Sequence, residues 1–457
     1  MRYRMERDVL GSVRIPADAY YGSETCRAAG NFRISGLRID REFIIAYVKL
    51  KKAAAIANMK AGKLDKERCG AIIKACNQLI NGKHLDQFVV DVFQAGAGTS
   101  TNMNVNEVIS NISIELLKGR KGDYRIIHPN DHVNMSQSTN DTYHTAIHIA
   151  CHGELKALGK ALASLEGAFA EKSAEFGRIK KIGRTHLQDA VPMSMGSEFS
   201  GYAGAVSKLA EHLGYVSGLL LEVPLGGTAL GTGINAGKEY TLHVYRELFH
   251  VTGAKFRKSR FIFTDMSQLI EELYLADFLE DSAVVLTKIA NDFRLLGSGP
   301  RAGLNELMLP AVQPGSSIMP GKINPSIAEA LNMACFQVRG NAGAVREAAS
   351  AGQMELNVFM PVVAYDLLYS IRILSNAINM FVEKCVRGVR ANSAFIEKEL
   401  SMDLSIATAL NPYIGYSKAS KVARYAYKNN ISVKEACIRM GILDKQKLER
   451  ILDPEKM

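Results

Sequence analysis

The chain has 457 residues, 47% of them hydrophobic and 22% charged, which is typical of a folded globular protein and excludes disorder as its main state. The 56 basic and 46 acidic residues leave a net charge of +10, which would attract either nucleic acid or a small anionic substrate, and charge alone does not decide between them. Because the basic residues are dispersed without a basic block, we expect no nucleic acid. Uninterrupted apolar runs stay below about 18 residues, so we expect no membrane-spanning helix.

The N-terminus and the cysteines indicate a cytoplasmic protein. The first residues, MRYRMERDVLG, carry five charges where an export signal needs an apolar segment. Seven cysteines are scattered singly, without a C-x-x-C pair, which disfavours a disulfide framework and a zinc ribbon. We therefore expect reduced thiols.

The predicted elements change in character along the chain. The N-terminal region mixes turn signals with one helical run at residues 41–61, and long helices follow. In one of them the apolar residues step by three and four, as on one face of a helix: Leu155, Leu158, Leu162, Leu165 and Phe169. Residues 267–296 contain no Gly or Pro, which allows a helix of roughly 45 Å, and further helices are expected near Pro325 and Pro361.

These patterns predict a mainly α protein built around a bundle of long helices. We expect a small N-terminal domain (1–141), a central long-helix bundle (142–390) and a small C-terminal domain (391–457). Narrow apolar stripes on long helices leave faces uncovered by a single chain, so the bundle is expected to be completed by oligomerisation. A monomeric bundle with a polar outer face is the alternative.

Two segments combine glycine, hydroxyl and amide residues. Residues 95–107, AGAGTSTNMNVNE, place Thr99 after two glycines, and residues 134–141, NMSQSTND, contain Ser138, Thr139 and Asn140. Hydroxyl and amide groups beside exposed backbone N–H groups can hold a carboxylate by hydrogen bonds. Either segment alone could instead be a helix cap or a turn.

A third segment, residues 183–192 (GRTHLQDAVP), contains Thr185 and His186, and we expect a helix soon after it. A single histidine in a helical protein is more often structural than catalytic. A fourth segment, residues 315–325 (GSSIMPGKINP), is predicted to be a mobile glycine-hinged loop.

The glycine spacings argue against nucleotide binding. In the fourth segment five residues rather than four separate the glycines, and Ile323 follows Lys322 where a Walker loop has Ser or Thr. Residues 231–237 miss the dinucleotide spacing by one residue, and no strand precedes them. Because the chain also lacks a G-x-S-x-G elbow, acyl-enzyme chemistry has no local support.

Together, the four segments resemble the aspartase/fumarase superfamily along essentially the full chain, and most closely its aspartate ammonia-lyases. Class II fumarases usually show GTQ where this chain has GTS at 98–100, and SQSSND where it has SQSTND at 136–141. The chain departs from its relatives at His144, where proline is common, at Ser197, which replaces a Gln, and at Ala95, which replaces a Gly.

The resemblance implies that L-aspartate loses a proton from its β-carbon and then ammonia, giving fumarate. It places the catalytic base at Ser316, whose alkoxide would need nearby backbone N–H groups and the charge of Lys322 to be favoured. The expected donors to the developing negative charge on the β-carboxylate, each worth about 3 to 4 kcal/mol when well placed, are Thr99, Ser138, Thr139 and Ser317.

The resemblance also implies which residues bind the α-carboxylate and the amino group of the substrate. Three residues would hold the α-carboxylate: Lys322, Asn324 and Thr185. Asn140 and His186 would surround the amino group, and Glu329 would orient the His186 ring by a hydrogen bond. Arg27 is either a supporting residue or a surface or interface arginine.

The expected partner is a small dicarboxylate or amino-acid substrate, without a cofactor, in a homotetramer whose active sites are shared between subunits. A class II fumarase is the alternative function, because water and ammonia leave by the same carbanion route. A non-catalytic structural homologue is a more remote alternative.

A histidine stripe, His144, His148 and His152, recurs at four-residue intervals with Cys151 alongside. Adjacent histidines at this spacing can chelate zinc on one helical face. No carboxylate lies in the stripe and the chemistry implied by the resemblance uses no metal, so we expect no metal site.

Overall fold

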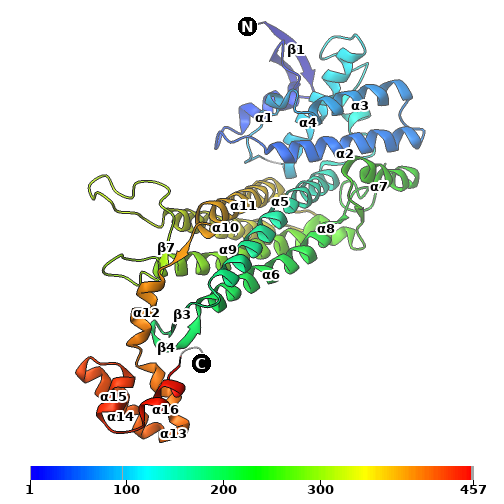
Figure 1. Cartoon of the computed structure of the whole chain (residues 1–457). Helices are drawn as coiled ribbons and strands as arrows, with labels where there is room; N and C mark the ends of the chain where they lie inside the picture. The colour runs from blue at the N-terminus through cyan, green and yellow to red at the C-terminus, as the bar shows by residue number, and fades with distance from the viewer. Residues whose placement is uncertain (1, 95, 454–457) are drawn as a thin grey trace. The chain divides into compact units, whose positions relative to one another are not determined.

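The computed structural model describes residues 2–94 and 96–453, and it shows the expected mainly α fold (Figure 1). Among these residues the strands form four two-stranded sheets. The chain divides into two compact units. Unit 1 comprises residues 1–159, 211–283 and 336–374, and unit 2 comprises residues 160–210, 284–335 and 375–457. The division into three domains at 141 and 390 stays a prediction.

Five long helices dominate the fold. Each of them has residues in unit 1 and residues in unit 2. They are α5 (Thr139–Glu175), α6 (Met195–Leu219), α9 (Ile270–Leu296), α10 (Ser326–Ser350) and α11 (Met360–Phe381). Helix α9 starts three residues later than predicted because Leu269 has a left-handed φ of 52°, which a helix cannot continue through. The predicted apolar seam of α5 is confirmed, since all five of its side chains are buried.

The N-terminal part of unit 1 begins with an antiparallel hairpin of β1 (Tyr3–Asp8) and β2 (Gly11–Pro16). Four helices follow: α1 (Ser23–Asn31), α2 (Arg41–Lys60), α3 (Lys66–Ile80) and α4 (Thr99–Leu116). Asp40 and Asp65 cap α2 and α3 by accepting hydrogen bonds from backbone N–H groups of their first turns. Helix α2 matches the run predicted at 41–61.

Within unit 2, four long helices meet at a cluster of phenylalanine rings. Phe169 of α5, Phe199 of α6, Phe293 of α9 and Phe381 of α11 are fully buried, with neighbouring ring centroids 5.2 to 6.5 Å apart. These separations are those of favourable edge-to-face aromatic pairs. The cluster therefore fixes the mutual packing of the helices in this unit.

Shorter elements connect and follow the long helices. In unit 1 they are β5 (Glu222–Val223), α7 (Lys238–Thr252), β6 (Arg257–Lys258), α8 (Ile262–Ser267) and the single turns at 85–87, 96–98 and 129–133. In unit 2 they are β3 (Lys180–Thr185), β4 (Gln188–Ser194), β7 (Leu307–Met308), β8 (Arg390–Ala391), α12 (Ser393–Ser401), α13 (Asn411–Ile414), α14 (Tyr416–Asn429), α15 (Val433–Arg439), α16 (Lys445–Ile451) and the turns at 382–386 and 405–410.

The C-terminal helices of unit 2 have an apolar core of their own, which includes Leu410, Val422, Ala426, Cys437 and Leu448.

In the part of the chain that is described, no helix is both long and apolar enough to cross a membrane. All seven cysteines are free thiols, as predicted, and six of them are buried.

Candidate active site

The first polar segment forms the tight entry to α4. Gly98 has a φ of +92°, and a Cβ at this position would lie 2.2 Å from the ring of Tyr143, so only glycine fits. The turn makes Thr99 the first residue of α4. Its hydroxyl donates to the carbonyl oxygen of Gly96 at 2.6 Å. Ala95, the first residue of this segment, lies outside the described residues.

The second polar segment meets the first at Thr139, the first residue of α5. The Thr99 and Thr139 hydroxyl oxygens are 3.3 Å apart, and Asn102 Nδ2 donates to Thr139 Oγ1 at 3.0 Å. Ser138 lies just before the helix, where its hydroxyl accepts a hydrogen bond of 3.3 Å from the Asn140 backbone N–H. The structure therefore brings Thr99, Ser138, Thr139 and Asn140 together in unit 1.

Asn140 has its amide orientation fixed by a neighbouring loop. Its Nδ2 lies 2.6 Å from the carbonyl oxygen of Ala229. Because a carbonyl oxygen can only accept a hydrogen bond, the amide nitrogen must face it. The Oδ1 atom of Asn140 is thereby left as an acceptor at the start of α5.

Asp141 is a residue of this region that the sequence analysis did not single out. Its carboxylate is fully buried and accepts three backbone N–H groups, from Ser138 at 2.9 Å, Gly226 at 2.9 Å and Thr228 at 3.0 Å. Burial raises the pKa of Asp141 to about 6. Asp141 thus joins the loop at 226–228 to the N-terminus of α5. It ends the motif SQSTND, so its place in the motif was an available signal.

Lys51 of α2 was also missed. Its fully buried amine donates to Asn134 Oδ1 at 2.8 Å, and Asn102 Nδ2 lies 3.3 Å from the same oxygen. Burial lowers the pKa of Lys51 to about 7. A line of polar contacts therefore runs from Lys51 through Asn134 and Asn102 to Thr139. In the sequence Lys51 stands in the run Lys49-Leu-Lys-Lys52, which looks like a solvated helix face.

The third segment forms a β-hairpin in unit 2, with Thr185 at the end of β3. His186 and Leu187 make its two-residue turn and have φ values of 57° and 60°. Positive φ at both positions suits a hairpin turn but is strained for residues other than Gly, Asn or Asp. The helix expected soon after His186 is delayed, because β4 intervenes and α6 begins only at Met195.

The fourth segment is a closed loop in unit 2. Gly315 N–H donates to the Lys322 carbonyl oxygen at 2.8 Å, and Asn324 Nδ2 donates to the Gly315 carbonyl oxygen at 2.6 Å. The Ser316 hydroxyl oxygen accepts backbone N–H groups from Ile318 at 3.2 Å and Met319 at 3.0 Å. The oxygen predicted to act as base thus lies in a local cluster of N–H donors.

The other predicted residues of unit 2 are placed as follows. Ser317 and Lys322 are exposed on the loop, Thr185 and His186 are exposed at the hairpin, and Glu329 is half-buried in the first turn of α10. Within the described residues no hydrogen bond joins Glu329 to His186. The roles assigned to all of these residues stay predictions.

Arg27 belongs to unit 1 and is engaged by the N-terminal hairpin. Its guanidinium forms a bidentate pair with Asp8 at 2.7 and 3.0 Å and donates to the Gly11 carbonyl oxygen at 3.2 Å. Most of its hydrogen-bonding capacity is therefore used within the hairpin, which suits the alternative structural interpretation.

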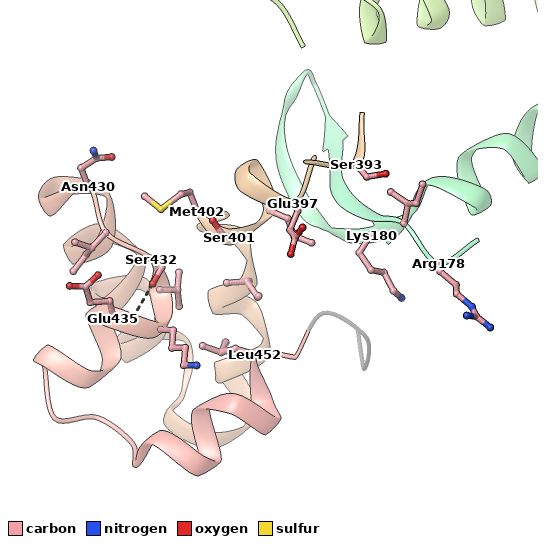
Figure 2. A pocket seen from close by; sticks show the side chains of 16 residues that line it. Arg178, Lys180, Ser393, Glu397, Ser401, Met402, Asn430, Ser432, Glu435 and Leu452 are labelled. Carbon is pink, nitrogen blue, oxygen red and sulfur yellow. Dashed lines mark hydrogen bonds between the residues drawn. The ribbon is translucent and has the colours of Figure 1, made fainter. Parts of the chain in front are cut away.

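A cavity of about 800 Å³ lies elsewhere in unit 2, near the C-terminus (Figure 2). Its lining includes Arg178, Lys180, Glu397 and residues 430–435, and Ser432 caps α15 there by accepting the Glu435 N–H at 3.1 Å. None of the predicted site residues lines it.

Comparison with protein families identifies the chain as a lyase. The family described as lyase matches residues 11–340, and the family described as the fumarase C C-terminus matches residues 406–457. Relatives agree along the whole chain. An aspartate ammonia-lyase from a Bacillus species is 45% identical over 99% of this chain and 97% of its own length. A class II fumarate hydratase from Thermosynechococcus vestitus is 47% identical with the same coverage.

Solved structures give the same result. A fumarate lyase:delta crystallin from Brucella melitensis bound to cobalt superimposes with a TM-score of 0.97 at 45% identity, covering 100% of this chain and 99% of that one. A class II fumarase from Schistosoma mansoni gives 0.96 at 36% identity with the same coverage. The chain belongs to the aspartase/fumarase superfamily, as its motifs predicted.

Proposed function

We propose that the protein is an aspartate ammonia-lyase that converts L-aspartate to fumarate and ammonia. The observation that carries the proposal is the pair of segments GTS at 98–100 and SQSTND at 136–141, which resemble those of aspartases more than those of fumarases. The orientation of Asn140 is compatible with this choice. An ammonium group has three N–H donors and needs acceptors, and Asn140 Oδ1 is left as an acceptor beside Thr139.

The chemical difficulty of the reaction is the weak acidity of the C–H bond beside an ionised carboxylate. Removing the β-proton puts a second negative charge on that carboxylate, and the electron pair then forms the Cα–Cβ double bond as the C–N bond breaks. Hydroxyl donors aimed at this carboxylate stabilise the intermediate because its charge grows there. We assign that role to Thr99, Ser138, Thr139 and Ser317. The Thr99 hydroxyl, which donates to the Gly96 carbonyl oxygen in the structure, would have to turn towards the substrate to do so.

Ser316 is the proposed base. An alkoxide is favoured where hydrogen-bond donors and a positive charge surround the oxygen. Two backbone N–H groups already point at Ser316 Oγ, and Lys322 is carried by the same loop. Lys322, Asn324 and Thr185 would hold the α-carboxylate, and His186, oriented by Glu329, would assist the leaving amine.

The proposed assembly is a homotetramer with shared sites. Several apolar side chains of the long helices are exposed in the single chain, as expected of surfaces that another subunit covers: Tyr215, Tyr274, Val284, Met333 and Phe336. A cytoplasmic location is part of the proposal, since seven free thiols suit a reducing compartment.

The alternative function is that of a class II fumarase, and one observation favours it: a fumarate hydratase matches this chain as well as the aspartases do. Separate incubation with L-aspartate and with L-malate, followed by fumarate absorbance, distinguishes the two. Fumarate from aspartate supports the proposal. Fumarate from malate alone assigns the protein as a fumarase, and no turnover of either contradicts both functions.

A further inference from the structure

Two histidines of the stripe on α5 meet a carboxylate from α9 in the core of unit 1. His144 Nε2 lies 2.7 Å from Glu272 Oε1, His148 Nε2 lies 3.1 Å from the same oxygen, and the two Nε2 atoms are 3.2 Å apart. All three side chains are fully buried. The expectation that no carboxylate joins the stripe was wrong, because Glu272 lies 124 positions beyond His148 in the sequence.

The backbone fixes which nitrogen of His148 carries a proton. His148 Nδ1 faces two carbonyl oxygens, of Glu222 at 2.9 Å and of Leu220 at 3.1 Å. Since carbonyl oxygens only accept, Nδ1 must be protonated, and in the neutral ring Nε2 then presents a lone pair to the cluster. A second-layer carbonyl that holds Nδ1–H in this way is the usual support of a metal-binding histidine.

A cation is needed between these three groups. In a neutral His148 the lone pair of Nε2 would face a lone pair of Glu272 Oε1, and the two would repel each other. If His144 Nε2 is protonated, it can donate a hydrogen bond to Glu272 Oε1. The repulsive contact between His148 and Glu272 would remain. Either an extra proton on His148 or a metal ion must balance the cluster, and burial makes an unbalanced arrangement costly.

The three atoms lie slightly closer together than the ligands of one metal ion would. Tetrahedral bonds of about 2.0 to 2.1 Å separate neighbouring ligand atoms by roughly 3.3 to 3.4 Å. The atoms here are 2.7 to 3.2 Å apart, so side-chain shifts of a few tenths of an ångström would admit an ion. The second carboxylate oxygen, Glu272 Oε2, is buried without a hydrogen-bond partner and could complete the coordination. These three residues form the candidate metal-ligand cluster identified among the described residues.

We propose that His144, His148 and Glu272 bind one divalent transition-metal ion, with Zn²⁺ as the ion that best suits two imidazoles and one carboxylate. The ion has a structural role. It links α5, five residues beyond Thr139, to α9 and to the backbone at 220–222. Because the site has no exposed atoms, the ion enters as the chain folds.

His152 provides a matched control on the same stripe. It lies one turn beyond His148, but its Nδ1 is engaged by Ser217, at 3.2 Å from the carbonyl oxygen and 3.1 Å from the hydroxyl. It is not part of the ligand cluster. Replacing it removes a histidine from the helix without removing a ligand.

The test measures zinc in the full-length protein produced in zinc-supplemented medium and dialysed against EDTA. We expect about one zinc per chain in the wild type and in His152→Gln, and about tenfold less or lower in Glu272→Gln and in His148→Gln. Zinc X-ray absorption on the wild type should show a nitrogen and oxygen shell near 2.0 to 2.1 Å with scattering from two imidazoles.

The absorption measurement needs no variant, so it decides the matter even if the ligand variants fail to fold. Metal-free wild-type protein would overturn the proposal and leave a protonated His148 paired with Glu272. Zinc that survives in folded Glu272→Gln and His148→Gln, or a spectrum without imidazole scattering, would do the same. If the wild type instead held about one ion of another transition metal per chain, and Glu272→Gln lost it, the result would support the site and replace Zn²⁺ as the proposed ion.

Discussion

The Nζ atom of Lys51 lies 2.8 Å from Asn134 Oδ1. The contact places a fully buried amine next to Asn134, the first residue of the motif NMSQSTND. The same Asn134 oxygen also accepts a hydrogen bond from Asn102 Nδ2. Burial disfavours the charged form of a lysine, and among the described residues no carboxylate is hydrogen-bonded to the Lys51 amine to offset this cost. Lys51 therefore supports the polar segments as a hydrogen-bond donor near neutral pH.

Lys51 gives the protein a specific pH dependence of stability. Burial lowers its pKa from 10.5 to about 7 in the folded state. Between these values the unfolded chain binds a proton that the folded chain has released, so the free energy of unfolding rises with pH, by at most about 1.4 kcal/mol per pH unit. Below pH 7 Lys51 is protonated in both states and its contribution to the slope vanishes. Burial also raises the pKa of the Cys69 and Cys76 thiols, which opposes the rise at the alkaline end of the window. The test is therefore the difference in free energy of unfolding between the wild type and Lys51→Met, which urea unfolding should show to rise with pH across this window.

Lys52→Met is the control for this prediction, because Lys52 is the next residue of α2 and donates to Asn77 at an exposed position. It should keep the wild-type slope. Protein concentration must be held constant, since assembly contributes to stability. Equal slopes in wild type and Lys51→Met would mean that Lys51 stays charged in the folded protein.

Replacing the proposed base should abolish most of the activity without affecting folding. Ser316→Ala removes the hydroxyl oxygen that accepts two backbone N–H groups in an exposed loop. General-base catalysis contributes about 10² to 10⁴-fold, so we expect kcat for aspartate to fall by that factor. Steady-state kinetics and thermal melts check both parts. Ser393→Ala, in the C-terminal cavity, should keep full activity, and a similarly active Ser316→Ala would exclude Ser316 as the base.

The loop itself can be tested without altering any group assigned to the chemistry. A Cβ at Gly315 would lie 2.4 Å from the Lys322 carbonyl oxygen, a backbone atom that cannot move aside without opening the loop. Gly315→Ala should therefore lower kcat/KM by about tenfold or more, since a misplacement of about 1 Å can cost 10²-fold. The melting temperature should change little because the loop is at the surface.

Gly70 supplies the matched glycine for that experiment. It lies inside α3, where a Cβ would meet no atom within 4 Å. Gly70→Ala should raise stability by about 0.5 to 1 kcal/mol and leave kcat/KM unchanged. If Gly315→Ala retained wild-type kinetics, the loop geometry at 315–324 would not matter for the reaction.

Asn140 tests the choice of aspartate. Removing its amide in Asn140→Leu takes away the acceptor for the ammonium group, and a hydrogen bond to a charged group is worth about 1.5 to 3 kcal/mol. We expect kcat/KM for aspartate to fall by about 10 to 100-fold, with binding of succinate, which has no amino group, changed much less. Equal losses for both would show that Asn140 acts on a carboxylate or on the fold.

Much of the fold could be read from the sequence because helical periodicity is local. Two patterns predicted long buried helices, and both helices were found. They are the apolar seam from Leu155 to Phe169 and the run before Gly297 that contains no Gly or Pro. The hairpin turn at His186 was missed because neither His186 nor Leu187 is a usual residue for positive φ. Lys51 and Glu272 were missed because their partners lie far away in the sequence, Asn134 in a loop and His148 on α5. Sequence spacing carries no information about such contacts.

The proposed sharing of sites between subunits has a quantitative consequence. If Ser316 and His186 reach one site from different chains, Ser316→Ala and His186→Ala subunits can together form sites that lack neither residue. Random exchange in an equal mixture gives each such site about a one-quarter chance of carrying both wild-type residues. The mixture should therefore recover about a quarter of wild-type activity, while each variant exchanged with itself stays inactive. If both residues of a site came from one chain, every site would carry one lesion, and no activity would return however complete the exchange.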